Sequence, residues 1–180
     1  MSYKESLPGV EPNLYALSYA VRQVLELAWN SETAYQGIEL QPNDAPSRGQ
    51  CGVSSVFLSR VLSSHGFNAY FTEGIIGLDN LDEEHVWVEV QDARQDGKPL
   101  VVDITSDQYQ STNGALVDIG VYGEGIGTIG SYSPLERFSP TDIPRKKLMA
   151  RYALLERNVD RIPFYKKRKQ RKLIKAFTGD

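Results

Sequence analysis

The chain has 180 residues, of which 41% are hydrophobic and 24% are charged, and its formal net charge is −3. This composition is that of an ordinary globular protein with one domain. No apolar run approaches the roughly 20 residues that span a bilayer, and Met1–Glu5 lacks the apolar stretch of a secretory signal. We therefore expect a cytoplasmic protein that makes no membrane contact.

The cysteine and histidine content excludes an internal disulfide and a structural zinc site. Cys51 is the single cysteine, so an internal disulfide is excluded. With only two histidines besides, the chain lacks the thiolate and imidazole ligands of a structural zinc site. We expect no metal and no cofactor.

The small net charge conceals two unequal parts. Residues 144–180 carry thirteen Lys and Arg against three Asp and Glu, a net of +10, and residues 1–143 carry a net of −13. We expect one domain over residues 1–160 and a basic tail over 161–180. The tail could be a solvated segment, fold back on the acidic body, or contact nucleic acid or another polyanion. The residues that would make such contacts are Lys166, Lys167, Arg168, Lys169, Arg171 and Lys172.

Two helices are expected in the first third of the chain. Asn13 is a suitable N-cap for a helix with apolar residues at helical spacing that fades near Trp29. Residues 41–50 are rich in turn-forming residues and predict a loop. A second helix is predicted to start close to Cys51 and to stop at Gly66.

Strand patterns follow the second helix, and a third helix follows the strands. The predicted strands are Ala69–Thr72, Gly74–Leu78, His85–Val90 and Leu100–Ile104. Residues 114–130 are punctuated by glycine and predict strands or a long loop, and a helix is expected over 146–158. The order predicts an α+β fold in which a cysteine-bearing helix packs on an antiparallel sheet.

Cys51 is predicted at the start of the second helix, a position that favours a nucleophilic thiolate. The free N–H groups and the dipole of a helix start stabilise a thiolate and could also hold an oxyanion. Gly49 and Gly52 are expected to keep the backbone beside the thiol open to substrate. A catalytic thiol needs a base and the base needs an orienting acceptor, and His85 and Asp103 are the candidates.

The register of the two strands that carry these residues is left open by the sequence. A tight turn at Asp96-Gly97 would place Gln108 opposite His85. A longer loop or a bulge would instead bring Asp103 opposite His85.

Three short motifs in chain order resemble the transglutaminase-like branch of the papain-like cysteine peptidase superfamily. They are Gly49-Gln50-Cys51-Gly52 opening a helix, His85-Val-Trp-Val-Glu-Val on a strand, and Val102-Asp103-Ile104-Thr105 on the next. The resemblance implies a papain-like core in which Cys51 is the nucleophile, His85 its base and Asp103 the group that orients His85. It also implies a protein or peptide amide as the substrate.

The resemblance leaves the donor that would stabilise an oxyanion unassigned. Gln50, Gln41, Trp87 and Gln108 are the candidates. The acids Asp79, Asp82, Glu83 and Glu84, which precede His85, are expected to raise its pKa and to favour a cationic partner.

Two functions follow from these patterns. The first is acyl transfer on an amide through a thioester on Cys51, as a thiol protease, amidase, deamidase or transglutaminase-type enzyme. The second is a non-catalytic protein of the same fold that binds a polyanion through its basic C-terminus.

Overall fold

The computed structural model describes residues 12–39, 41–78, 81–91, 98–109, 118–121 and 131–163. Within these ranges the chain forms three α-helices, two short 3₁₀ helices and five strands. The helices are α1 (Pro12–Glu26), α2 (Cys51–Ser64) and α3 (Lys146–Arg161), with η1 (Tyr35–Gly37) and η2 (Ser106–Gln108). The strands are β1 (Asn68–Leu78), β2 (Leu81–Gln91), β3 (Leu100–Asp103), β4 (Asp118–Val121) and β5 (Ser131–Phe138). The predicted α+β class is confirmed.

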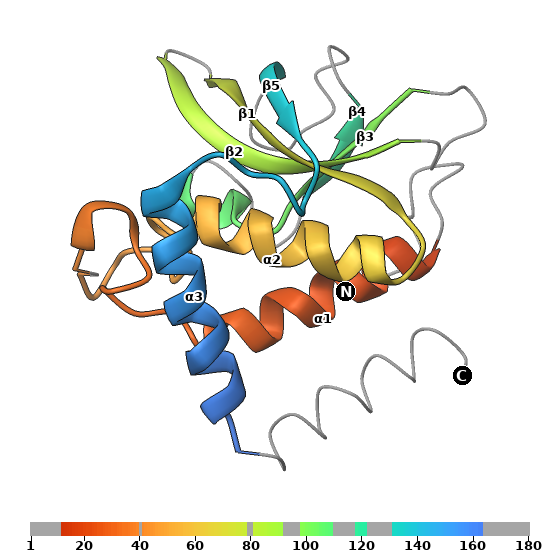
Figure 1. Cartoon of the computed structure of the whole chain (residues 1–180). Coiled ribbons are helices and arrows are strands. Elements are labelled where there is room, and N and C mark those ends of the chain that lie inside the picture. Colours follow the sequence, from red (N-terminus) through yellow and green to blue (C-terminus); the bar gives the residue numbers. More distant parts are fainter. Residues whose placement is uncertain are drawn as a thin grey trace.

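The strands form one antiparallel sheet in the order β4-β3-β2-β1-β5, and the three helices lie together beneath it (Figure 1). The sheet is strongly curved. The hydroxyl of Tyr132 on β5 lies 3.0 Å from Oδ2 of Asp103 on β3, although β1 and β2 stand between these strands. In a flat sheet, three strand spacings would separate them by about 14 Å, which is beyond the reach of a tyrosine. The curvature therefore creates a second, concave interior away from the helices.

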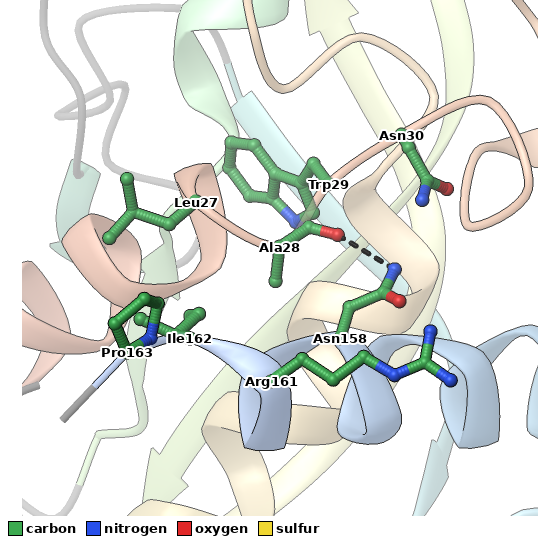
Figure 2. Close-up of a pocket in the computed structure, with 8 residues that line it drawn as sticks. All are labelled: Leu27, Ala28, Trp29, Asn30, Asn158, Arg161, Ile162 and Pro163. Atoms are coloured by element: carbon green, nitrogen blue, oxygen red, sulfur yellow. Dashed lines mark hydrogen bonds between the residues drawn. The ribbon is translucent and has the colours of Figure 1, made fainter. Parts of the chain in front are cut away.

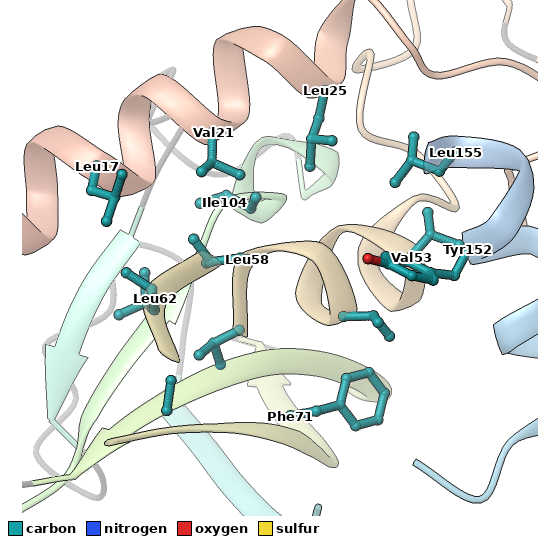
Figure 3. Packing of buried hydrophobic residues seen from close by; sticks show 14 of the residues in the cluster. Leu17, Val21, Leu25, Val53, Leu58, Leu62, Phe71, Ile104, Tyr152 and Leu155 are labelled. Atoms are coloured by element: carbon teal, nitrogen blue, oxygen red, sulfur yellow. The ribbon is translucent and has the colours of Figure 1, made fainter. Parts of the chain in front are cut away.

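The main core lies between the sheet and the helices, with α2 at its centre. Val53, Val56, Leu58 and Leu62 of α2 are fully buried, and this helix contacts β1, β2, α1 and α3. Figure 3 shows the apolar side chains of α1 and α3 converging on α2. A smaller cluster fills the concave side of the sheet and consists of Ile76, Trp87, Val101 and Tyr132. Burial on both faces fixes the position of β2 and of the residues it carries.

Helix α2 begins at Cys51, as the sequence predicts, and the chain leaves it through Gly66, whose φ is +87°. The first helix differs from expectation, because it begins at Pro12 and Asn13 therefore lies inside its first turn rather than capping it. Proline suits that position, since its fixed φ is helical and its missing N–H would have no partner there. The third helix starts at Lys146 as expected and extends to Arg161.

The strands also depart from the pattern in places. The two predicted segments from 69 to 78 form one continuous strand, β1. Strand β5 was not predicted, because Pro134 interrupts its pattern; an edge strand tolerates proline, whose missing N–H can face away from the sheet. Of residues 114–130, only β4 is described. The predicted turn at Asp96-Gly97 and the basic run Lys166–Lys172 lie outside the described residues.

The observed register of β2 and β3 matches neither sequence alternative. Val88 pairs with Val102 and Val90 with Leu100. Continued along the strands, this register places Asp103 opposite Trp87 and position 105 opposite His85. Both predictions of a direct partner for His85 are therefore wrong. The buried valines on the helix side set the alignment, and His85 and Asp103 meet as diagonal neighbours on the concave side.

A fully buried arginine fixes the segment that follows β3. The guanidinium of Arg22 on α1 donates to both carboxylate oxygens of Asp107, at 2.6 and 2.7 Å, and to the carbonyl oxygen of Ile104 at 2.8 Å. It also pairs with Glu26 and lies over the ring of Trp29. This bidentate geometry gives both direction and strength to the contact, so α1 holds the turn after Asp103 in place.

None of the helices in the described part of the chain is long and apolar enough to cross a membrane.

We predict that Arg22→Met lowers the free energy of unfolding by about 3 kcal/mol, because it leaves the carboxylate of Asp107 without its buried counter-ion. The measurement is urea denaturation followed by circular dichroism. Arg48→Met is the matched control, since Arg48 makes an ion pair of the same length with Asp44 at the surface. The control should hardly change the unfolding midpoint; equal effects of both substitutions would contradict the assigned role of Arg22.

Candidate active site

The loop before α2 determines where Cys51 lies. The N–H of Tyr35 donates to the carbonyl oxygen of Gly49 at 2.7 Å, and Gly49 has a φ of +72° that favours glycine. A Cβ on Gly49 would also lie 3.3 Å from Cδ1 of Ile38. The chain thus turns sharply and enters α2 at Cys51, which is half-buried.

A side-chain contact ties the start of α2 to the strand that carries His85. The hydroxyl of Ser55, one turn after Cys51, donates to the carbonyl oxygen of Val86 at 3.2 Å. Val86 is the neighbour of His85, so this bond sets the distance between the thiol-bearing turn and the imidazole. Cys51 lies near enough to His85 to contribute to its raised pKa.

Asp103 holds the other side of the imidazole. Nε2 of His85 lies 2.7 Å from Oδ2 of Asp103, and both side chains are almost completely buried. The carboxylate also accepts from the N–H and hydroxyl of Thr105, both at 2.8 Å, and from the hydroxyl of Tyr132 at 3.0 Å. Burial alone would raise the pKa of Asp103, but His85 and Thr105 outweigh burial and lower it. Asp103 is therefore a buried carboxylate anion whose charge is stabilised by hydrogen bonds from the protein.

The same contacts make His85 a strong base. Burial tends to lower its pKa, yet the charge and hydrogen bond of Asp103, with a smaller contribution from Cys51, raise the pKa to about 10. The imidazole is therefore protonated at neutral pH. Since Nε2 faces Asp103, the nitrogen left to interact with Cys51 is Nδ1. Among the described residues, Asp103 and Cys51 are the groups that raise the pKa of His85, so the expectation that the preceding acids raise it is not met for Asp82, Glu83 and Glu84. Glu83 acts instead on Tyr109. Asp79 lies outside the described residues.

Aromatic rings enclose the imidazole. Trp87 is fully buried and stacks on His85 with ring centroids 6.1 Å apart, and the ring of Tyr109 meets His85 edge-on at 5.2 Å. Gly74, which pairs with His85 across β1 and β2, leaves room for this arrangement. A Cβ on Gly74 would lie 2.4 Å from Cη2 of Trp87. Water is thereby excluded from the His85–Asp103 contact, which strengthens it.

Of the four candidates for the oxyanion donor, the structure places two beside His85 and two elsewhere. Nε2 of Gln108 lies 3.5 Å from Nδ1 of His85, and Trp87 lies beside the same ring, so both are at the site. The amide of Gln50 is engaged elsewhere: it accepts from the hydroxyl of Thr33 at 2.9 Å and donates to the carbonyl oxygen of Asn30 at 3.0 Å. Gln41 is exposed in its loop.

The expected role of the two glycines beside Cys51 is wrong. A Cβ on Gly52 would lie 2.9 Å from Cδ1 of Leu148, so Gly52 allows the close approach of α2 and α3. Gly49 provides the turn into α2. A Cβ on either glycine would meet other parts of the protein, so these glycines serve helix packing and the turn rather than an uncluttered backbone beside the thiol.

The sequence assigns no role to three residues that contact His85 or Asp103 in the structure, namely Thr105, Tyr132 and Tyr109. Thr105 follows Asp103 by two residues, a spacing at which a threonine can bond the preceding aspartate, and this signal was available. No local sequence signal indicates the role of Tyr132, since its strand is not predicted and its contact with Asp103 depends on the curvature of the sheet. Tyr109 ends the stretch Ser106-Asp107-Gln108-Tyr109, which is part of the resemblance, but the sequence assigns it no role.

A surface pocket lies away from these residues. It is formed where α1 and α3 end, between Leu27–Asn30 and Asn158–Pro163, and is crossed by the hydrogen bond from Asn158 to the carbonyl oxygen of Ala28 (Figure 2). It contains none of Cys51, His85 and Asp103. Within the described ranges, no group of three or more His, Cys, Asp or Glu side chains could hold a metal ion.

Comparison of the chain with models of protein families, with curated proteins and with solved structures found no match.

We predict that Tyr132→Phe lowers the free energy of unfolding by about 2 kcal/mol, because it removes one of the donors to a buried carboxylate. Chemical denaturation measures the change. The control is Tyr70→Phe on β1, since no hydrogen bond involves the Tyr70 hydroxyl among the described residues. A loss as large in the control would show that the Tyr132 hydroxyl does not act through Asp103.

We predict that stability falls as pH rises above 6.5 toward 10, because the folded protein keeps a proton on His85 that the unfolded chain releases. The slope should reach at most about 1.4 kcal/mol per pH unit. The measurement is the urea midpoint against pH in a Cys51→Ala background, which removes titration of the thiol and also the smaller contribution of Cys51 to the His85 pKa, so the fall should end below pH 10. Adding His85→Gln should flatten the curve over this interval, and an unchanged slope would contradict the assignment.

Proposed function

We propose that this protein is a cysteine-dependent acyltransferase or hydrolase that acts on an amide through a thioester on Cys51. What supports the proposal is the grouping of Cys51, His85 and Asp103 from three separate elements: His85 bonds Asp103 at 2.7 Å, and Cys51 contributes to the raised pKa of His85. We further propose a papain-like core of the transglutaminase-like branch. The cysteine-bearing helix on an antiparallel sheet and the chain order Cys, His, Asp support it.

The first half-reaction follows from the protonation of His85. Its charged imidazole stabilises a thiolate on Cys51, because opposite charges in a poorly hydrated site attract strongly. Sγ attacks the carbonyl carbon of the substrate, and the C–O double bond becomes an oxyanion. As the oxyanion collapses, the C–N bond breaks, Nδ1–H of His85 gives its proton to the departing amine, and a thioester remains on Cys51.

The oxyanion needs donors close to Sγ. Cys51 is the first residue of α2, so its own backbone N–H is among those without an intrahelical partner. The side-chain amide of Gln108, next to the imidazole, is the second donor that we propose, because its contact with Oγ1 of Thr105 at 3.4 Å is longer than the contacts that hold Gln50. Gln50 is not proposed, because its amide is bonded to Thr33 and Asn30.

The second half-reaction regenerates the thiol group. Water or an amine gives a proton to Nδ1 of His85 and attacks the thioester carbon. The C–S bond then breaks and Sγ leaves as the thiolate, paired again with the imidazolium. Water as acceptor makes the protein a hydrolase, and an amine makes it a transferase. Asp103 keeps Nε2–H engaged throughout, so that Nδ1 is the nitrogen that exchanges the proton.

We predict that iodoacetamide at pH 6 alkylates Cys51 at least 100-fold faster in the wild-type protein than in His85→Gln, because the thiolate is the reacting species and the imidazolium stabilises it. Intact-mass spectrometry over time gives the rate. His65→Gln is the matched control: His65 is the second histidine, is exposed at the end of α2 and bonds the carbonyl oxygen of Val61. Equal rates for wild type and His85→Gln would overturn the proposal.

We predict that p-nitrophenyl acetate acetylates Cys51, with a burst of p-nitrophenolate equal to the protein concentration. Cys51→Ser should abolish the burst. Adding a primary amine at constant pH separates the two outcomes: acetylated amine formed faster than with Cys51→Ser, which reports the direct reaction of the amine with the ester, indicates transfer, and release of acetate without this excess indicates hydrolysis. A burst that survives in Cys51→Ser would show that the acyl group resides elsewhere.

A further inference from the structure

A second cation lies beside the start of α2. Arg151 projects from α3, and its Nη2 is 3.8 Å from the position that a Cβ on Gly52 would take. Its guanidinium also lies 5.6 Å from the ring centroid of Tyr35, which is 55% exposed. Arg151 therefore stands between the residue that follows Cys51 and an exposed aromatic ring at the surface.

The guanidinium is only partly satisfied. Its Nη1 donates to the carbonyl oxygen of Thr33 at 3.2 Å, and among the described residues this is the hydrogen bond that it makes. Partial burial lowers the pKa of Arg151, while the charges of Cys51 and Tyr35 act in the opposite direction. A half-buried arginine with donors to spare, next to a thiol, is suited to bind an anion that approaches that thiol.

Among the described residues, no carboxylate neutralises this position. The charged groups that act on Arg151 are Cys51 and Tyr35, whereas the neighbouring cation Arg145, at the start of the same helix, is paired with Glu73 and Glu136. Arg145 is thus a cation of α3 that is neutralised by carboxylates, and Arg151 differs from it. Arg151 has no carboxylate partner among the described residues.

We propose that Arg151 is a specificity-determining residue that binds a carboxylate of the acyl donor next to the carbonyl attacked by Cys51. This rests on the proposed function and adds the substrate class: amides that carry a carboxylate near the reacting bond. Arginine binds a carboxylate through two parallel N–H···O bonds, and the Thr33 contact and the Tyr35 ring hold its plane. The anionic group therefore orients the substrate over Sγ.

The test compares two alkylating agents that differ in one group. Iodoacetate and iodoacetamide both form an S–C bond on Cys51 and release iodide, but only iodoacetate carries a carboxylate. We expect Arg151→Gln to lower the ratio of the iodoacetate rate to the iodoacetamide rate by roughly tenfold, in keeping with the loss of one charged contact. Arg157→Gln, which removes an exposed cation from the same helix, should leave the ratio unchanged.

The outcomes separate this inference from the proposed function. If Arg151→Gln changes neither this ratio nor the preference between the second pair of probes described below, while alkylation still depends on His85, the inference about Arg151 is wrong and the proposed function stands. If alkylation does not depend on His85, the proposed function fails first. Arg151→Lys keeps the charge but not the paired donors, and an intermediate ratio supports carboxylate binding. Urea midpoints of all variants control for loss of folding.

A second pair of probes locates the carboxylate. Peptidyl chloromethyl ketones ending in Asp or Asn also alkylate Cys51 with loss of chloride. A preference for Asp that Arg151→Gln removes assigns the carboxylate to the side chain of the acyl residue. An Arg151-dependent preference for iodoacetate without one for Asp assigns it to a terminal carboxylate of the substrate. No Arg151-dependent preference in either pair overturns the proposal.

Discussion

The buried charge of Asp103 is the constraint on which the site depends. A carboxylate taken out of water without partners costs several kcal/mol, and here the donors come from β2, β5 and the turn after β3. No single element could supply them. The sheet has to curve so that Tyr132 reaches across two strands, and β3 has to stop so that the chain can fold Thr105 back onto the carboxylate. The geometry around His85 follows from satisfying this one anion.

The segment from Asp103 to Gln108 is held from both sides by buried ion pairs. His85 binds Asp103 on the concave side of the sheet, and Arg22 binds Asp107 on the side of α1. The hydroxyl of Ser47, from the loop before α2, also donates to Oδ1 of Asp107 at 2.5 Å. The segment that supplies Thr105 and Gln108 to the site is therefore joined to α1 and to the loop that precedes Cys51. A catalytic geometry needs such support, because small displacements cost much of the rate.

The candidate site holds charges of both signs, although most of it lies in a segment with a strongly negative net charge. Residues 1–143 have a net charge of −13, and this excess favours a cationic partner if charges are summed over the segment. Two cations nevertheless lie near Cys51: the imidazolium of His85, which is paired with Asp103, and the guanidinium of Arg151 from the C-terminal part of the chain. Exposed charges beyond about 8 Å are screened by salt, whereas partly buried charges in contact are not. The cations near Cys51 therefore act on a ligand at the site more strongly than the distant acids that make up the net charge of residues 1–143.

The sequence by itself determined the elements of the site and their order: an α+β chain, a helix that starts at Cys51, and strands that carry His85 and Asp103. Helical spacing, the stop at Gly66 and strand composition are local signals, so they can be recognised without the fold. Only the tertiary structure decided the β2–β3 register, the strand with Pro134, the contribution of Tyr132 and the place of Arg151 beside Gly52. The reason is physical: the register is set by which valines are buried against α2, and the contacts of Tyr132 and Arg151 depend on sheet curvature and helix packing between residues far apart in sequence.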